Sequence, residues 1–321
     1  MTKSKISLIV SVLNEAQTIK VLLQAIANQV TPPEEIIIVD GGSTDTTVSL
    51  IQEFAQNLPS SSLPKLKFTL KILPNSNRSQ ARNWAINQAK HDLIAITDAG
   101  CVPQPSWLKH LLKKYQETKA NIVGGYFYGL PATPFEQAVV AYTLQMPDQI
   151  NPDQFMPTTR SVLLERSIWK KLGGFNEKLS LNEDFEFFYR ARQKGVKFAF
   201  EKQALVGWLP RRNLTEFTQM IYRFAQGDIQ AGIIRPKVTL LFGRYLLALA
   251  TILILIFFTN VDSTRLIIVI LFWLAIYLSW AIQKNLKYVS QGWYWLPVLQ
   301  IVADMAVMTG SLMGLRRLRQ E

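Results

Sequence analysis

Asp40 lies in a pattern that could deliver a carboxylate to a ligand. It ends the apolar run EIIIVD and is followed by Gly41 and Gly42, which permit backbone conformations closed to other residues. Asp40 could simply cap the helix that follows, but the Ser-Thr-Asp run at 43–45 can cap it equally well. We therefore expect Asp40 to be available to accept hydrogen bonds from a base or a ribose, with helix capping as the alternative.

Asp98, in the segment AITDAGC, is a second carboxylate directly after an apolar run. Gly100 allows a ligand to approach the backbone closely. One carboxylate beside a phosphate suits Mg²⁺ or Mn²⁺, which take oxygen ligands and often keep phosphate oxygens in their coordination shell. We expect Asp98 to hold such an ion together with a phosphate. An aspartate that only caps its own loop is the alternative.

Two further acids, Glu183 and Asp184, open a predicted helix after Asn182. Composition alone favours a helix-dipole role, since acidic side chains stabilise the first turn of a helix. Considered together with Asp40 and Asp98, they gain a second interpretation, in which the later acid is a general base. The three sites would then be a base-binding acid, a phosphate or metal acid, and a proton acceptor.

The segments that carry the first two acids predict a parallel α/β sheet. Apolar strand runs alternate with helix-period segments from Ile6 to about Ala99, and a polar loop at 57–65 precedes the third strand. Continuous apolar strands between helices indicate a mostly parallel sheet covered on both faces. Ligands bind such sheets at the carboxyl ends of the strands, which is where Asp40 and Asp98 stand.

After Cys101 the pattern becomes mixed. We expect a helix at 107–118, a strand at 121–129, helical pieces at 165–179 and 182–195, and a short pair of strands at 197–210. As the only cysteine, Cys101 excludes an intrachain disulfide and a zinc site built from a cysteine cluster.

The last third of the chain has the composition of a membrane domain. Residues 238–258 are apolar apart from Arg244, which can snorkel near one end, and 266–282 form a second apolar run. Both are predicted transmembrane spans. A third segment, 293–315, carries Asp304, so a full span and a re-entrant or interfacial helix both stay open. A full span would place the basic tail RRLRQ outside, against the positive-inside rule.

The net charge of +12 is concentrated before the first apolar run. Residues 190–237 hold ten Lys or Arg against three Asp or Glu. Basic residues beside membrane spans usually face the cytoplasm, where anionic lipid attracts them. We interpret the charge as membrane-facing, and we expect membrane lipid rather than nucleic acid as a partner.

The segment NLTEFTQMIYRFAQGD has the pattern of an amphipathic helix that lies in the headgroup region. Asn213 can cap this helix, with Glu216 completing a box-like pair. Our hypothesis is that Arg211, Arg212 and Arg223 lie where a lipid-linked phosphate or a leaving diphosphate would bind. Ordinary arginines that snorkel along a membrane surface are the alternative.

Five segments appear in order along the chain: SLIVSVLNEAQTI, IIIVDGGSTDTT, ARNWAINQA, LIAITDAGCVPQPSWL and ERSIWKKLGGFNEKLSLNEDFEFFYRARQKG. Together they resemble the family 2 glycosyltransferases, inverting nucleotide-sugar enzymes with the GT-A fold. The likeness runs from about Ile6 to Lys237 and is nearest to a membrane-associated branch with C-terminal hydrophobic helices. We expect a catalytic domain at 1–210, a basic interfacial helix region at 211–237 and a membrane domain at 238–321.

The resemblance also implies roles for individual residues. Glu15, Asp40 and Arg82 would line the nucleotide pocket. Asp98 would be the first acid of the family's DxD element, which holds the metal and the diphosphate of the donor. Asp184 would match the base that deprotonates the acceptor hydroxyl as its oxygen attacks the anomeric carbon of the sugar.

Two departures from the family pattern matter. The DxD element reads DAG, so Gly100 replaces its last acid and metal dependence is less secure. The QxxRW signature of processive polysaccharide synthases is incomplete, because Gln219 and Arg223 stand one residue further apart and the tryptophan is missing.

We assign Glu183, like Arg211, Arg212 and Arg223, to contacts with the acceptor or a phosphate.

The sequence thus predicts a membrane-anchored inverting glycosyltransferase that moves a sugar, with UDP as the expected nucleotide, to a lipid-linked or membrane-proximal acceptor. Its catalytic domain would face the cytoplasm at a bacterial inner membrane. Two alternatives stay open: a membrane-anchored nucleotide-sugar-binding protein with impaired catalysis, and a nucleotidyltransferase. The latter usually carries a glycine-rich loop with a phosphate-gripping Arg or Lys directly after the first strand, which SVLNEAQT lacks.

Overall fold

A computed structural model describes residues 4–57, 66–258 and 262–318 of the chain. The polar loop predicted at 57–65 lies outside these residues except for Asn57, and so does Arg319 of the basic tail. The chain divides into two units, each described here by itself. The first comprises 1–130 and 145–209, and the second comprises 131–144 and 210–321.

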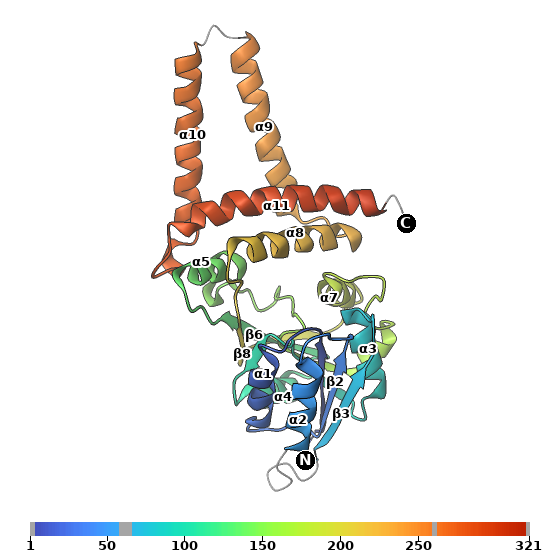
Figure 1. Ribbon diagram of the computed structural model, residues 1–321. Coiled ribbons are helices and arrows are strands. Elements are labelled where there is room, and N and C mark those ends of the chain that lie inside the picture. The colour runs from blue at the N-terminus through green and yellow to red at the C-terminus, as the bar shows by residue number, and fades with distance from the viewer. Residues whose placement is uncertain (1–3, 58–65, 259–261, 319–321) are drawn as a thin grey trace. The chain divides into compact units, whose positions relative to one another are not determined.

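The first unit is a sheet flanked by helices (Figure 1). Among the described residues its strands are β1 Ile6–Val12, β2 Glu35–Asp40, β3 Lys67–Ile72, β4 Leu93–Ile96, β5 Cys101–Pro103, β6 Ile122–Gly129, β7 Val162–Glu165 and β8 Phe198–Trp208. Its α-helices are α1 Ile19–Ala27, α2 Thr47–Gln56, α3 Arg78–Gln88, α4 Trp107–Thr118, α6 Arg166–Lys171 and α7 Glu183–Gln193. The α/β class predicted from the sequence is confirmed.

The strands follow the order β3-β2-β1-β4-β7-β6-β8-β5. β1 runs parallel to β2 and β4, and β2 runs parallel to β3, as the alternation of strands and helices predicts. Beyond β4 the sheet is mixed. β7 is antiparallel to β4 and β6, β8 is parallel to β6, and β5 is antiparallel to β8.

The central parallel strands are buried on both faces, which explains their continuous apolar runs. Every residue of β2 and of β4 is buried. Ala85 of α3 and Phe187 and Phe188 of α7 belong to the buried cluster that includes Ile37 and Ile96 of these strands. The helices that carry the predicted site residues are therefore fixed to the sheet by apolar packing.

The strand register brings two of the predicted acids to one edge of the sheet. Val12, the last residue of β1, pairs with Asp40, the last residue of β2. Ile96 ends β4 beside Ile9 of β1, and Asp98 follows two residues later. Asp40 and Asp98 thus stand at the carboxyl ends of parallel strands, where α/β sheets bind ligands.

β8 is one continuous strand, so the predicted pair of strands at 197–210 is wrong. Gly125 of β6 pairs with Glu201, whereas the next residue of β6 pairs with Leu205. The extra residues of β8 form a bulge, where Gln203 N donates to the Glu201 carboxylate at 2.9 Å. The polar run EKQ is typical of a turn, but a bulge accommodates it without ending the strand.

The second unit consists of helices, with no strand among its described residues (Figure 1). They are α5 Pro134–Thr143, α8 Leu214–Gln230, α9 Pro236–Phe258, α10 Ser263–Gln283, α11 Trp295–Leu318 and a 3-10 turn at Leu286–Tyr288. By length and composition α9, α10 and α11 could each cross a membrane. They contain most of the three apolar segments expected from the sequence.

α11 differs from the other two apolar helices in its surroundings. In its most apolar window 44% of the residues are buried, against 0% in α9 and 6% in α10. A Cβ at Gly310 would lie 2.4 Å from the carbonyl oxygen of Tyr222, and one at Gly314 would lie 3.0 Å from that of Gln226. Glycines spaced by four residues permit such close helix packing, so α11 packs along α8.

Candidate active site

The loop after β2 closes around Asp40. Its buried carboxylate accepts hydrogen bonds from Gly42 N at 2.9 Å and Ser43 N at 2.8 Å, and its second oxygen accepts one from Ser43 Oγ. Gly42 has a φ of 99°, a conformation that glycine adopts without strain. Asp40 therefore fixes the shape of this loop, and its contact with a nucleotide stays a prediction.

The loop after β1 is tied to the loop after β2. Asn14 donates its N–H to Ser43 Oγ at 2.8 Å, and Glu15 donates its N–H to Thr47 Oγ1 at 2.8 Å. The Glu15 side chain is partly exposed. Glu15 and Asp40 therefore belong to two adjoining loops at one sheet edge, which is the arrangement that a shared nucleotide pocket requires.

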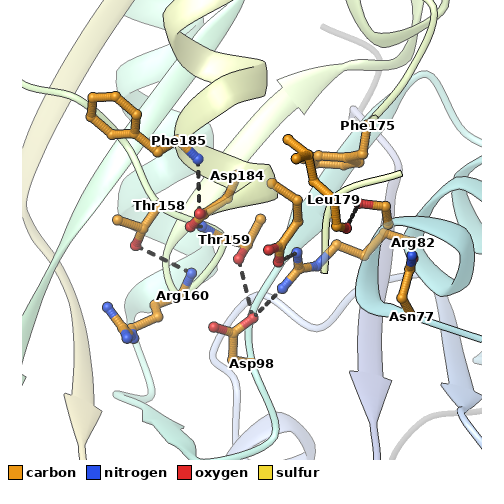
Figure 2. Close-up of polar contacts among 12 residues, drawn as sticks. Asn77, Arg82, Asp98, Thr158, Thr159, Arg160, Phe175, Leu179, Asp184 and Phe185 are labelled. Atoms are coloured by element: carbon orange, nitrogen blue, oxygen red, sulfur yellow. Dashed lines mark hydrogen bonds and ion pairs between the residues drawn. The ribbon is translucent and has the colours of Figure 1, made fainter. Parts of the chain in front are cut away.

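Arg82 of α3 joins two of the predicted acids. Its side chain is 2% exposed, and Nη2 lies 2.9 Å from Asp98 Oδ1 (Figure 2). Nη1 pairs with Glu183 at the start of α7. A buried guanidinium is costly without partner charges, so this buried ion-pair network fixes α3, α7 and the segment after β4 together. The carboxylate of Glu183 forms an ion pair with Arg82, and the contact of Glu183 with an acceptor or phosphate stays a prediction.

α3 also holds the loop at 173–182 that leads into α7. Asn83 Oδ1 accepts a hydrogen bond from Phe175 N at 2.9 Å, and Asn83 Nδ2 donates to Phe175 O at 2.8 Å. Gly174 precedes this contact with a φ of 77°, and a Cβ there would lie 2.8 Å from Asn83 Oδ1. The adjacent residues Arg82 and Asn83 thus position α7 from both its first turn and the loop before it.

Thr159 connects Asp98 with Asp184. Its hydroxyl donates to Asp98 Oδ1 at 3.2 Å, and its N–H donates to Asp184 Oδ2 at 3.3 Å (Figure 2). Asp184 Oδ1 accepts a further hydrogen bond from Phe185 N at 2.8 Å. The acid expected at the diphosphate and the acid expected as base therefore belong to one hydrogen-bonded site.

The charges of this site act on one another. Burial tends to raise the pKa of Asp98, but Arg82, followed by Arg160, holds it below the ordinary value of 3.8. Burial tends to lower the pKa of Arg82, yet Glu183 and Asp98 raise it above its ordinary value. The folded protein therefore favours the ionised form of both Asp98 and Arg82.

Thr159 and Arg160 were missed by the sequence analysis. They precede β7, whose first residue, Val162, pairs with Ile96 at the end of β4. Because the two strands are antiparallel, β7 begins where β4 ends, and the residues before it reach the carboxyl edge. Arg160 lies there with its guanidinium 4.8 Å from the ring centroid of Phe127. The run TTR before the apolar run VLLE was the available signal.

Arg211, Arg212 and Arg223 belong to the second unit. The first two precede Asn213, the N-cap residue of α8, and the third lies within the helix. The predicted cap of this helix is confirmed, because Asn213 Oδ1 accepts a hydrogen bond from Glu216 N at 2.9 Å. The contacts of the three arginines with a phosphate stay predictions.

Asp98 fits a divalent ion that takes its other ligands from phosphate and water. Its side chain is 32% exposed; Oδ1 bonds to Arg82 and Thr159, whereas no described residue bonds to Oδ2. Gly100 stands where the DxD element has its last acid. A Cβ at Gly100 would meet nothing within 4 Å, so no other described side chain fills the place of that acid. The described residues contain no cluster of three His, Cys, Asp or Glu. Such a donor set suits Mg²⁺ or Mn²⁺ bound together with a diphosphate.

The comparisons with known proteins assign this mixed sheet to the glycosyltransferases. The sequence model of the family described as Glycosyl transferase family 2 matches residues 7–173, more than half of the chain. The chain belongs to this family. Glycosyltransferase AglE of Haloferax volcanii is 25% identical over 234 residues, which cover 71% of this chain and 74% of AglE.

Two further proteins are similar to this chain. One is a dolichyl N-acetyl-α-D-glucosaminyl phosphate 3-β-D-2,3-diacetamido-2,3-dideoxy-β-D-glucuronosyltransferase of Methanococcus voltae, 35% identical over 119 residues, which cover 36% of this chain and 35% of that enzyme. The other is a solved structure, mannosyltransferase PcManGT from Pyrobaculum calidifontis in complex with GDP-Man and Mn²⁺. It aligns with a TM-score of 0.64 at 18% identity, over 96% of this chain and 88% of that one. This likeness confirms the GT-A fold.

Proposed function

We propose that this glycosyltransferase is anchored in a membrane and moves a sugar, with inversion, from a nucleotide donor to a lipid-linked acceptor. The observation that carries the proposal is the pair of hydrogen bonds from Thr159 to Asp98 and to Asp184. Transfer needs one group at the leaving diphosphate and a base at the incoming hydroxyl, both arranged around one anomeric carbon. Asp98 and Asp184 meet this need because Thr159 donates a hydrogen bond to each of them.

Asp184 is the proposed base. It accepts the proton of the acceptor hydroxyl as the hydroxyl oxygen attacks the anomeric carbon. The bond from that carbon to the diphosphate oxygen breaks, its electron pair leaves with the diphosphate, and the configuration at the carbon inverts. The N–H groups of Thr159 and Phe185 hold the carboxylate, so that it meets the hydroxyl in a fixed orientation.

Asp98 is the proposed ligand at the donor diphosphate. A divalent ion bound there would neutralise the negative charge that develops on the leaving group. Arg160 is close enough to influence Asp98 electrostatically and can face phosphate oxygens from the same side. Arg82 acts as a positioning residue, because its guanidinium is buried between Asp98 and Glu183.

The nucleotide pocket is proposed at the adjoining loops that carry Glu15 and Asp40, with UDP as the nucleotide. PcManGT, which shares the fold, was solved with GDP-Man, so a GDP-sugar is the competing donor. The lipid-linked acceptor is supported by the Methanococcus voltae enzyme, whose name describes a dolichyl-linked acceptor.

The membrane arrangement is proposed from the second unit. α9 and α10 would span the membrane. α11 would lie at the membrane surface, since it packs along the amphipathic α8 and more of its residues are buried than in α9 or α10. An interfacial α11 keeps Arg316 on the same side as the first unit, as the positive-inside rule requires for a cytoplasmic catalytic domain. The proposed compartment is a bacterial inner membrane.

Full-length protein in detergent, screened against UDP-sugars and GDP-Man with and without Mn²⁺, tests the proposal. Thermal shift measures donor binding, and chromatography detects a glycosylated lipid formed from a polyprenyl phosphate or its saccharide. We expect one nucleotide sugar to stabilise the protein and to yield a glycolipid. Binding without turnover would favour the impaired binding protein, and release of pyrophosphate from a nucleoside triphosphate would favour the nucleotidyltransferase.

A further inference from the structure

A charged cluster lies among the helices of the second unit, and the proposed reaction uses none of its residues. At its centre is Asp304 of α11, whose side chain is 5% exposed. Asp304 Oδ2 accepts hydrogen bonds from Arg244 of α9, Tyr245 Oη and Tyr277 Oη, and Oδ1 accepts one from Gln300 Nε2 at 2.8 Å. A carboxylate in an apolar helix is costly, and a fully bonded one indicates a built site.

The cations of the cluster outnumber its single acid. Lys284, directly after α10, donates to the neutral Gln300 Oε1 at 3.2 Å. Lys237 lies seven residues before Arg244 in α9, two turns away on the same face of the helix, and its charge repels that of Lys284. With Arg244 the cluster holds three positive charges against the one negative charge of Asp304. Two positive charges are therefore not neutralised by the described residues of the cluster.

Aromatic rings surround these cations. The Lys284 ammonium lies 5.1 Å from the ring centroid of Tyr142 and 5.4 Å from that of Trp280, and the Arg244 guanidinium lies 5.0 Å from that of Tyr277. Tyrosine and tryptophan favour the membrane interface, because their rings are apolar and their polar atoms are wet. The cluster thus combines charge for an anion with apolar surface for a hydrocarbon chain.

The cluster lies at one end of the two predicted spans. Arg244 is eight residues beyond the start of α9, or about 12 Å along the helix, and it contacts Tyr277 and Trp280 near the end of α10. This is the end at which α9 begins and α10 ends. Lys237 is the second residue of α9 and Lys284 directly follows α10, so both stand at the ends of the predicted spans, where the headgroup phosphates of a bilayer are found.

We propose that Lys237, Arg244 and Lys284 bind a phosphate group carried by a lipid. We take this lipid to be the phosphorylated acceptor, an identity that rests on the proposed function. Arg244 stays paired with Asp304 and orients the site, while the two lysines supply the charge that the phosphate neutralises. Bulk anionic phospholipid carries the same chemistry, so the test compares the two lipids.

The test uses full-length protein in nanodiscs and measures binding of a polyprenyl phosphate and, separately, of phosphatidylglycerol. The variant Lys237→Gln/Lys284→Gln should weaken binding roughly tenfold or more, because each basic residue near the headgroups contributes to phosphate attraction. The matched control is Arg265→Gln, since Arg265 lies in the first turn of α10, at the other end of that helix, beside Asp262 at 3.2 Å. This control should bind as the unmodified protein does.

The binding measurements with the two lipids distinguish the possible sources of the phosphate. Weakening confined to polyprenyl phosphate assigns the site to the acceptor, and equal weakening for both lipids assigns it to headgroups in general. Unchanged binding of both lipids overturns the proposal. Since Arg244→Gln alone would strand Asp304, Arg244→Gln/Asp304→Asn is the second variant, with thermal unfolding to verify folding. Donor binding, read in parallel, separates failure of this site from failure of the proposed transferase.

Discussion

The guanidinium of Arg82 lies 2.9 Å from the carboxylate of Asp98, and the arginine is the buried member of the pair. The side chain of Arg82 is 2% exposed, whereas that of Asp98 is 32% exposed. One end of this ion pair is therefore fixed inside the protein, and the other end is partly exposed to solvent. The arrangement explains how a partly exposed carboxylate can be held in one place.

Replacing Arg82 by Gln should destabilise the protein strongly. The change leaves Glu183, whose side chain is 4% exposed, without the cation that it pairs with. Stranding one member of a buried pair typically costs about 3–5 kcal/mol. Thermal unfolding should show a clearly lower midpoint, whereas Lys109→Gln on the exposed surface of α4 should leave it unchanged. Adding Glu183→Gln should recover part of the loss, and a double variant that recovers none would contradict this pairing.

Stability should fall in acid through Asp98. Because folding lowers the pKa of Asp98 below its ordinary value of 3.8, the ionised carboxylate stabilises the folded state. That contribution is complete above the ordinary pKa and is lost as the pH falls below 3.8 through the lowered pKa. Urea unfolding at pH 6 and pH 3 should show a smaller acid loss for Asp98→Asn than for the unmodified protein. Glu53→Gln, at an exposed ion pair, is the control, and equal losses in both variants would count against the assignment.

Gly174→Ala should reduce turnover through the loop before α7. The substitution places a Cβ 2.8 Å from Asn83 Oδ1 and so shifts the loop that sets Asp184. Gly173→Ala is a matched control, because Gly173 has nearly the same φ, 79° against 77°, but a Cβ there meets nothing within 4 Å. Both variants carry backbone strain of about 1–2 kcal/mol. Only Gly174→Ala should lower kcat, and similar kcat values in the two variants would argue against this positioning role.

The parallel half of the fold and two of its acids could be predicted from the sequence. Continuous apolar runs, bounded by helices, determine that strands such as β2 are buried on both faces, and Asp40 and Asp98 must then follow at one edge. The conformation of Asp40 could not be predicted. Composition offered several capping residues, but the buried carboxylate takes the nearest donors, those of Gly42 and Ser43.

Thr159 and Arg160 could not be placed because their position depends on a long-range pairing. They reach the site only because β7 is antiparallel to β4, a strand more than sixty residues earlier. Local periodicity carries no information about that choice of partner. The contact of Gly310 with Tyr222 is hidden for the same reason, since α8 and α11 are separated by two long helices.

Gly310→Ala should destabilise the second unit. Its Cβ would lie 2.4 Å from the carbonyl oxygen of Tyr222, which cannot move without shifting α8. Gly243→Ala is the control, because Gly243 lies in α9 with nothing within 4 Å of its Cβ, and alanine favours a helix by about 1 kcal/mol over glycine. Thermal unfolding in detergent should give a lower midpoint for Gly310→Ala alone. A lower midpoint in both variants would mean that helix packing is not the cause.

The central claim is that Asp184 deprotonates the acceptor in a site that it shares with Asp98. Its most direct test is the transfer rate of Asp184→Asn, measured with saturating donor and lipid acceptor, alongside donor affinity. Glu186→Gln is the control, since Glu186 lies on the same helix but pairs with Arg190 at 2.6 Å. We expect Asp184→Asn to lower kcat about 10²–10⁴-fold with donor affinity little changed, and Glu186→Gln to retain activity. Wild-type turnover in Asp184→Asn would contradict the account.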